Sequence, residues 1–478
     1  MVIYNVLYKD GSFGKIELGD MINKGGAAGK IYLCNGSPLI AKIFHDRNKS
    51  STNRQKLQSM MLNRPVFPPA IKDKIEYTQI SWPEAILEDG EGFCVGYLMP
   101  LIHMGEAVSL DHLMQKAIRK KLGLPEKYTY RIFAAYNVAS MVSSLHIKGH
   151  YIVDLKPSNV SVYKDNMMVA MVDCDGFSIN GENARYPAEF VSEEYIYPEG
   201  MELSCAEMGE EQDKFALAVI IFKLLNNGIH PFSGTPRAID DRNLTIQQRI
   251  EGYHYAYGLW PDNYQAPHPY SIHEYFDKKT LELFERAFTK GNNRPTALEW
   301  QEHLRTLLNG LKKCKKDPHH AYFTSKGCGL CISEQKFSDN MNGIRNRLEN
   351  PQTIRGMELS ALSEENVKRN KIERIEKASR LKYIALSFMT TYLLFFTFLF
   401  KLLDFNKEKI VSISFGLQAL FITLVMVGIN KSLNYLKHLP ILNNRSVLQM
   451  MKVYAFACLI IAALWINDFD WKFFALHL

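Results

Sequence analysis

Short strands separated by turns are predicted over the first hundred residues. Apolar positions there alternate with polar ones or form short continuous runs, and Gly, Asn and Asp lie between the runs. The expected strands are 15–20, 30–36, 38–44, 78–89 and 92–100. One helix, at about 51–63, is expected to interrupt them, so this part of the chain is predicted to be β-rich.

The spacing of apolar residues becomes helical after Leu110. Over 128–148 they recur three and four positions apart, at Ile132, Ala135, Val138, Ala139, Val142 and Leu145. Residues 212–225 and 279–309 are also predicted to be helical, and a small strand region is expected at 151–179. Strands followed by helices indicate an α+β fold with two lobes, an N-lobe over 1–102 and a helical C-lobe over 103–310.

Three long apolar runs follow residue 382. Residues 383–400 and 410–429 contain no charged side chain and are 18 and 20 residues long, which suits a hydrocarbon core roughly 30 Å thick. The third run, 446–466, is expected to span if Lys452 snorkels, and otherwise to lie in the interface. Buried core helices are the alternative, but apolar side chains cover all faces of the first two runs.

Basic residues beside the first apolar run predict its orientation. The linker 338–382 carries seven Lys and Arg side chains between 368 and 382, and the loop 401–409 carries three lysines. Positive charge gathers on the cytoplasmic side of membrane helices, so we expect a multi-pass protein of the inner or plasma membrane with everything before 382 in the cytoplasm. The N-terminus lacks a signal-peptide pattern. The net charge of +7 is modest, and no nucleic-acid partner is expected.

A glycine-rich turn lies between two predicted strands, at 19–31. Gly26 and Gly29 have no Cβ atoms, so backbone N–H groups there can approach a phosphate closely. A plain hairpin turn is the alternative. The next predicted strand carries Lys42 between apolar neighbours, where its ammonium group can reach phosphate oxygens.

Two acidic segments add chemistry to this turn. The run 154–159 supplies the carboxylate of Asp154, the ammonium of Lys156 and the amide oxygen of Asn159. Asp173 and Asp175 follow an apolar strand and offer hard oxygen ligands of the kind that Mg²⁺ prefers. A capped turn before a strand is the alternative interpretation of the 154–159 run.

In this order, the glycine turn, Lys42 and the 154–159 run resemble the protein kinase superfamily over about residues 18–309. Four later elements extend the resemblance: 197–199 is similar to the A-P-E element, 213–218 to the aspartate-led buried helix, 228–232 to the G-x-x-P-F turn and 293–296 to the R-P-T element. The resemblance implies a bilobal kinase fold and an ion pair between Glu199 and Arg294.

The resemblance also implies ATP and Mg²⁺ as cofactors, with nucleotide held between the lobes. Lys42 would bind the α- and β-phosphates, and Gly26 and Gly29 would cover them. Adenine would bond to the Pro100 carbonyl and the Ile102 N–H, although a plain connecting strand is the alternative there.

The transferred phosphoryl group would be handled by the two acidic segments. Asp154 would accept the proton of a serine or threonine hydroxyl, and Lys156 would offset charge on the transferring group. Asn159 and Asp173 would hold Mg²⁺. Asp175 is kept as a second metal candidate, because Gly176 and Phe177 follow it in swapped family order.

Several positions depart from the family pattern. Lys24 replaces the first glycine of the loop, and Ile152-Val153 replace the usual His-Arg before the catalytic aspartate. No acidic residue lies between Asp46 and Asp73, so Lys42 is expected to lack its usual glutamate partner. A nucleotide-binding pseudokinase scaffold at the membrane is therefore the main alternative to an active kinase. A small-molecule kinase is disfavoured, because the elements at 197–199 and 293–296 support a peptide-docking lobe.

A cysteine and histidine cluster follows the kinase-like region, at 311–337. Cys328 and Cys331 form a C-x-x-C half-site, and Cys314 with either His319 or His320 could complete a tetrahedral zinc site. A redox pair or free thiols are the alternative. The arrangement is similar to a group of bacterial kinases with D-x-D in place of D-F-G. By this resemblance, the gene neighbourhoods of such kinases imply a cognate metal-dependent phosphatase and a von Willebrand A-type protein as partners.

Taken together, the sequence predicts a membrane-anchored kinase that transfers the γ-phosphoryl group of ATP to serine or threonine of itself or of a partner protein. The expected order is N-lobe, C-lobe, zinc knuckle, basic linker and membrane helices.

Overall fold

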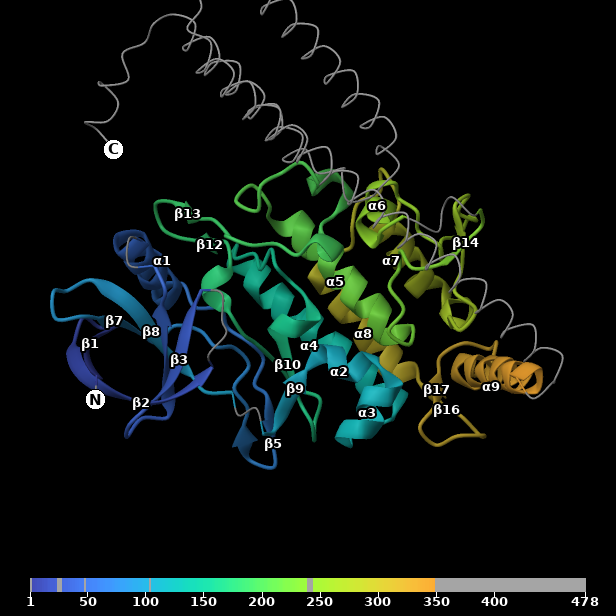
Figure 1. Ribbon diagram of the computed structural model, residues 1–478, viewed down its shortest axis with the longest axis horizontal. Helices are drawn as coiled ribbons and strands as arrows, with labels where there is room; N and C mark the ends of the chain where they lie inside the picture. Colours follow the sequence, from blue (N-terminus) through green and yellow to red (C-terminus); the bar gives the residue numbers. More distant parts are fainter. Residues whose placement is uncertain (1, 24–27, 47–48, 103–104, 239–243, 349–478) are drawn as a thin grey trace, which may run out of the picture. The chain divides into compact units, whose positions relative to one another are not determined.

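A computed structural model describes residues 2–23, 28–46, 49–102, 105–238 and 244–348 (Figure 1). Gly26, residues 349–382 of the predicted linker and the predicted spans at 383–400, 410–429 and 446–466 lie outside the described residues. Within the described residues, no helix is both long enough and apolar enough to cross a bilayer.

Six antiparallel strands of the N-terminal part close into a barrel in the order β1-β2-β3-β4-β8-β7. Their bounds are β1 Val2–Tyr8, β2 Phe13–Asn23, β3 Gly29–Cys34, β4 Leu39–Phe44, β7 Ala85–Glu88 and β8 Cys94–Pro100. The expected strand at 78–89 is shorter than predicted, because Pro83 has no N–H to donate to a ladder. Ile80 forms only an isolated bridge, with Met171. The short hairpin of β5 (Ile71–Lys72) and β6 (Ile75–Glu76) lies apart from the barrel.

The helix α1 (Ser50–Leu62) confirms the helix predicted at about 51–63. It contacts β7 and β8 of the barrel and also β12 (Ile179–Asn180) of the helical lobe. Leu57, Met60 and Met61 are buried on its inner face, and the indole N–H of Trp82 donates to the Met60 carbonyl at 2.8 Å. The helix is therefore positioned to connect the two lobes.

Helices dominate the second lobe, with α4 (Tyr128–Ile147) packed between α5 (Glu210–Leu225) and α8 (Ala297–Gly310) (Figure 1). The single helix expected at 279–309 is in fact two helices, α7 (Lys278–Phe288) and α8. Pro295 prevents a continuous helix. Thr296 then caps α8 in a capping box with Glu299.

A small sheet places the chemistry between the lobes. Its strands are β9 (Ala107–Ser109), β10 (Val160–Tyr163) and β11 (Val169–Met171). The 154–159 run leads into β10, and Asp173 follows β11, so the antiparallel pairing of these strands brings both acidic segments to one edge. The remaining elements are α2 Leu110–Met114, α3 Lys116–Leu122, β13 Arg185–Tyr186, β14 Thr235–Pro236, α6 Ile246–Glu251 and β15 Gln265–Ala266.

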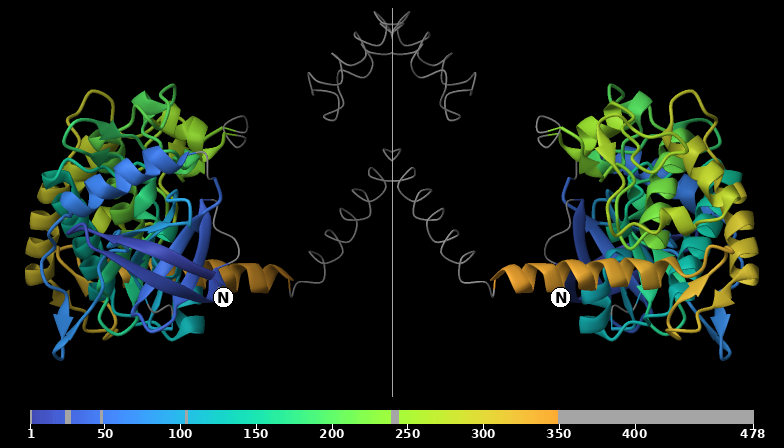
Figure 2. Two further views of the ribbon diagram at one scale, coloured as in Figure 1. Left: turned by 90° about the vertical axis from the view of Figure 1, so that its left-hand side faces the viewer. Right: turned by 90° about the vertical axis from the view of Figure 1, so that its right-hand side faces the viewer.

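The cysteine-containing segment forms a small hairpin and a helix after α8. The hairpin consists of β16 (Lys312–Lys313) and β17 (Ala321–Tyr322), and α9 (Gly329–Leu348) begins just after Cys328. Figure 2 shows α9, in orange, extending away from the helical lobe.

Candidate active site

Lys42 lies on β4 with its ammonium group buried at the interface of the lobes. Its side chain is only 5% exposed, and its Nζ atom is 2.6 Å from Oδ1 of Asp175 and 3.3 Å from Oδ1 of Asp173. Gly96 on β8 allows the two strands to lie close together at Lys42, because a Cβ atom there would lie 2.0 Å from the Lys42 carbonyl oxygen. Burial lowers the pKa of Lys42, but the two carboxylates outweigh burial and the net shift is upward.

Asp175 is the acidic partner that the sequence did not reveal for Lys42. Its side chain is 10% exposed, and the same oxygen also accepts a hydrogen bond of 2.9 Å from the Tyr97 hydroxyl. Burial raises the pKa of Asp175, yet Lys42 outweighs this effect and the net shift is downward. As expected, α1 supplies no glutamate to Lys42; the acid that contacts the ammonium most closely comes from the D-C-D motif instead.

Asp173 and Asn159 both have an oxygen atom that could bind a metal ion in the cleft. The Asp173 side chain is 60% exposed, and its backbone has the left-handed φ of 55°. The amide nitrogen of Asn159 donates to the Asp154 backbone and side chain at 3.0 and 3.2 Å, which leaves its amide oxygen for other ligands. The Val172 N–H donates to the Asn159 carbonyl at 3.1 Å and links the two segments. This donor set fits Mg²⁺.

Asp154 lies in a compact polar network with Lys156 and Ser192. Lys156 Nζ is 2.7 Å from Oδ2 of Asp154, and the Ser192 hydroxyl donates to Oδ1 at 2.7 Å. Lys156 also donates to the Ser192 hydroxyl oxygen at 2.9 Å. Sequence reasoning missed Ser192. Apart from tyrosines, the hydroxyl side chains between Phe177 and Glu199 are those of Ser178 and Ser192. The sequence therefore narrows the hydroxyl partner of Asp154 in this segment to two serines but does not decide between them.

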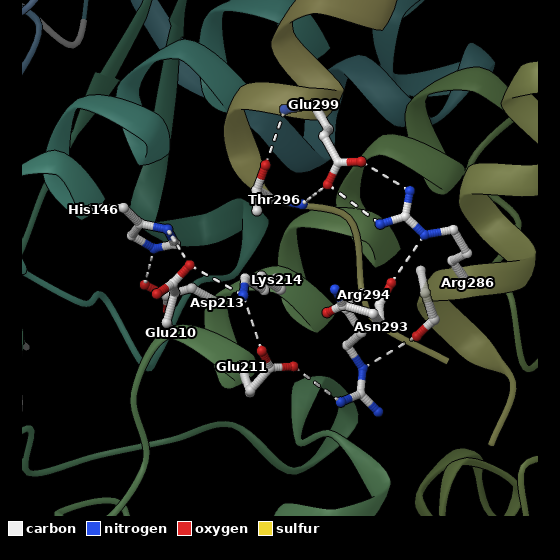
Figure 3. A network of polar contacts seen from close by, with 11 residues as sticks. His146, Glu210, Glu211, Asp213, Lys214, Arg286, Asn293, Arg294, Thr296 and Glu299 are labelled. Atoms are coloured by element: carbon white, nitrogen blue, oxygen red, sulfur yellow. Dashed lines mark hydrogen bonds and ion pairs between the residues drawn. The ribbon is translucent and has the colours of Figure 1, made fainter. Parts of the chain in front are cut away.

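The backbone before Asp154 is strained and held by a buried carboxylate. Val153 has a φ of 63°, which is unfavourable for a β-branched residue. The N–H groups of Ile152 and Val153 each donate to Asp213 at 2.7 Å. His146 contacts the same carboxylate at 3.0 Å (Figure 3). Because Asp213 is fully buried on α5, it fixes the loop that presents Asp154.

The ion pair implied for Glu199 and Arg294 is confirmed, at 2.5 Å. Arg294 also contacts Glu211 at 3.4 Å and donates to the Ala287 carbonyl at 3.2 Å (Figure 3). The end of the 177–199 segment is thereby tied to the base of the helical lobe. Ser192 lies seven residues before Glu199, so this anchor also holds the segment that contacts Asp154.

Residues from both lobes line one cleft with a volume of about 560 Å³. From the barrel and α1 it is lined by Gly29, Lys42 and Lys56, and from the helical lobe by Asp154, Lys156, Asn159, Asp173, Asp175 and Ser192. A Cβ atom at Gly29 would lie 2.4 Å from the Ile43 carbonyl oxygen, so only glycine fits there. Pro100 and Ile102 are not among the lining residues, and Ile102 is buried with Ala107 and Tyr163. The adenine contacts there stay a prediction.

The second cluster contains Cys314, His320, Cys328 and Cys331, whose ligand atoms all lie within 4.8 Å of one another. His319, the other histidine considered, is outside this group, and its N–H donates to Asp317 at 2.7 Å. Nδ1 of His320 is 3.3 Å from Sγ of Cys331. Three thiols and one imidazole form a donor set that fits structural zinc.

Comparisons with known proteins match part of this chain to protein kinases. Residues 98–305 match the family model for the protein kinase domain. Two curated relatives, both named Protein kinase YegI, come from Escherichia coli K12 and from Escherichia coli O157:H7. Each is 29% identical over 317 residues, which are 64% of this chain and 46% of the relative. The chain thus spans about half the length of the curated relatives it matches.

A solved rhoptry kinase from Toxoplasma gondii is 14% identical and has a TM-score of 0.39, with coverage of 64% of this chain and 84% of that one. The family match over residues 98–305 and the two curated relatives support a kinase fold for the matched part of this chain.

Proposed function

We propose that this chain is a membrane-anchored protein kinase that transfers the γ-phosphoryl group of Mg-ATP to serine or threonine hydroxyls of itself or of a partner protein. One observation carries the proposal: Lys42, Asp154, Asn159 and Asp173 come from distant segments and line a single cleft. Phosphoryl transfer requires a cation that binds the phosphates, a group that accepts the hydroxyl proton and ligands for the metal ion.

The chain's own groups define the reaction. Asp154 accepts the hydroxyl proton as the hydroxyl oxygen bonds to the γ-phosphorus, while the bond from that phosphorus to the bridging oxygen of ADP breaks. Lys156, 2.7 Å from Asp154, offsets negative charge on the transferring group. Mg²⁺ held by Asn159 and Asp173 supplies neutralisation of phosphate charge when bound. Ser192 orients both Asp154 and Lys156 through its hydroxyl.

The preference for serine or threonine rests on the resemblance of Asp154-Leu155-Lys156-Pro157 to serine/threonine kinases. The contact of Lys156 with Asp154 supports it, because the ammonium then lies beside the position of the attacking hydroxyl. A nucleotide-binding scaffold was favoured by the lack of an acidic partner for Lys42. Asp175 now fills that role, which makes active transfer the better-supported function.

The direct test is incubation of the purified 478-residue chain with Mg²⁺ and ATP labelled at the γ-phosphate. We expect label on serine or threonine after acid hydrolysis of the protein. Binding of Mg-ATP with no label on the chain or on added protein substrates would contradict the kinase and favour the scaffold. Label on tyrosine would contradict only the specificity.

Membrane anchoring rests on the apolar segments 383–400 and 410–429 and the basic residues before them. We expect the chain to resist alkaline carbonate extraction from membranes, and release into the supernatant would refute anchoring. The phosphatase and von Willebrand A-type partners are proposed from resemblance alone. Affinity purification of the tagged chain with each candidate would test them.

Zinc binding is proposed for Cys314, His320, Cys328 and Cys331, and the neighbouring histidines allow a matched test. Purified wild-type protein is expected to contain about one zinc per chain by metal analysis, because a structural zinc ion takes four protein ligands and this cluster supplies four. His320→Ala should lower zinc affinity by at least about tenfold, whereas His319→Ala should retain the metal. Equal retention by both variants would contradict the proposed ligand set.

A further inference from the structure

Lys56 is a buried cation on the side of α1 that faces the cleft. It is 8% exposed and lines the same cleft as Lys42 and Asp175. The segment between Asp46 and Asp73, which includes all of α1, contains no acidic residue, so this helix brings a positive charge to the nucleotide region. The proposed mechanism gives Lys56 no role.

The surroundings of Lys56 do not satisfy its charge. Three lysines of the described residues are buried: Lys42, Lys56 and Lys214. Lys42 and Lys214 each contact two carboxylates, Lys214 at 3.1 and 2.9 Å. For Lys56, the hydrogen-bond acceptor within the described part of the chain is the Pro187 carbonyl at 3.4 Å, a long and weak contact.

The nearby acids are already engaged. Asp175 accepts hydrogen bonds from Lys42 and Tyr97 on one oxygen, and Glu189 pairs with Lys49 at 2.9 Å. Burial lowers the pKa of Lys56 to about 8, and the remaining attraction of Asp175 and Glu189 only partly opposes this shift. An ammonium group with three donors and one weak acceptor lacks an anion.

We infer that Lys56 is a second phosphate-binding cation, which donates from α1 to the terminal phosphate oxygens of a nucleoside triphosphate held in the cleft beside Lys42. A triphosphate tail offers several charged acceptors in the place where Lys56 lacks them. In this arrangement Lys42 of the barrel stays paired with Asp175 of the helical lobe. Lys56 connects α1 directly to the bound nucleotide. The inference rests on the proposed nucleotide-binding function.

The test compares ligands with and without terminal phosphates. Lys56→Met keeps the length and apolar stem of the side chain but removes its charge. By calorimetry on the 478-residue chain, this variant is expected to bind Mg-ATP about tenfold more weakly, the loss typical of one charge-assisted hydrogen bond. Its affinity for adenosine should stay within about twofold of wild type, because adenosine offers no phosphate acceptor. Lys278→Met is the matched control, since the Lys278 side chain is 91% exposed and lies outside the cleft.

Lysine labelling of the wild-type chain gives a second measurement that does not depend on a variant that folds. Mg-ATP should protect Lys56 from an amine-acylating reagent more strongly than adenosine does, with Lys278 unprotected by either, as read by mass spectrometry. Unchanged Mg-ATP affinity in Lys56→Met, an equal loss for adenosine, or no protection of Lys56 would each overturn the inference. If the wild-type protein bound no Mg-ATP, the proposed function would fail together with the inference. If the wild-type protein bound Mg-ATP and Lys56→Met bound it equally well, only the inference would fail.

Discussion

Replacing Asp154 with asparagine is expected to reduce phosphoryl transfer by about 10²–10⁴-fold, the range contributed by a positioned acid or base. Asparagine has nearly the same shape but cannot take up the hydroxyl proton. It also removes the negative charge that holds Lys156 at 2.7 Å and accepts from Ser192 at 2.7 Å. The initial rate of label transfer from γ-labelled ATP measures the effect, and calorimetry should show Mg-ATP affinity close to that of wild type.

Asp165→Asn is the matched control for this substitution. Asp165 lies in the turn between β10 and β11, close in sequence to the 154–159 run, and its side chain is exposed. The control should transfer phosphate at the wild-type rate. If Asp154→Asn and the control had the same rate, the cleft would not be a phosphoryl-transfer site, whatever nucleotide it binds.

The candidate site residues that the sequence pointed to and that the structure brings into one cleft come mainly from short local runs. Asp154, Lys156 and Asn159 lie within six residues, so the sequence alone shows that they are close together, although Asp213 and Ser192 from distant segments hold them in place. The pair of Glu199 with Arg294 joins distant segments, and only the resemblance to kinases made it predictable. Periodicity located α4 closely, because its buried face repeats over five turns.

The parts that the sequence could not supply depend on side chains that meet across the fold. Asp175 and Lys42 are 133 positions apart, and no local pattern shows that the second carboxylate of a D-C-D turn points toward Lys42 on β4. Ser192 reaches Asp154 across 38 positions. His319 and His320 are adjacent, and the hairpin geometry alone selects His320. The break between α7 and α8 was visible at Pro295, so that error was avoidable.

The two aspartates of the D-C-D turn are expected to respond differently to the same change. Asp175→Asn leaves the ammonium of Lys42 buried with a single exposed partner at 3.3 Å, and breaking a buried pair in this way costs about 3–5 kcal/mol of folding free energy. Asp173→Asn removes a carboxylate that is 60% exposed, so stability should change little while Mg²⁺-dependent transfer is lost. Urea unfolding and label transfer, measured on both variants, distinguish the two roles.

The pH dependence of this difference follows from the sign of the shift. The pKa of Asp175 is lowered in the folded protein, since Lys42 outweighs the opposing effect of burial. Its stabilising contribution is therefore fully present above the ordinary aspartate pKa of about 3.9 and is lost as the pH falls through the lower folded value. The stability gap between wild type and Asp175→Asn should be constant from neutral pH to about pH 5 and then narrow on acidification. A gap that widens below that pH, or an equal loss of stability in Asp173→Asn, would mean that Asp175 is not the counterion that keeps Lys42 charged in the cleft.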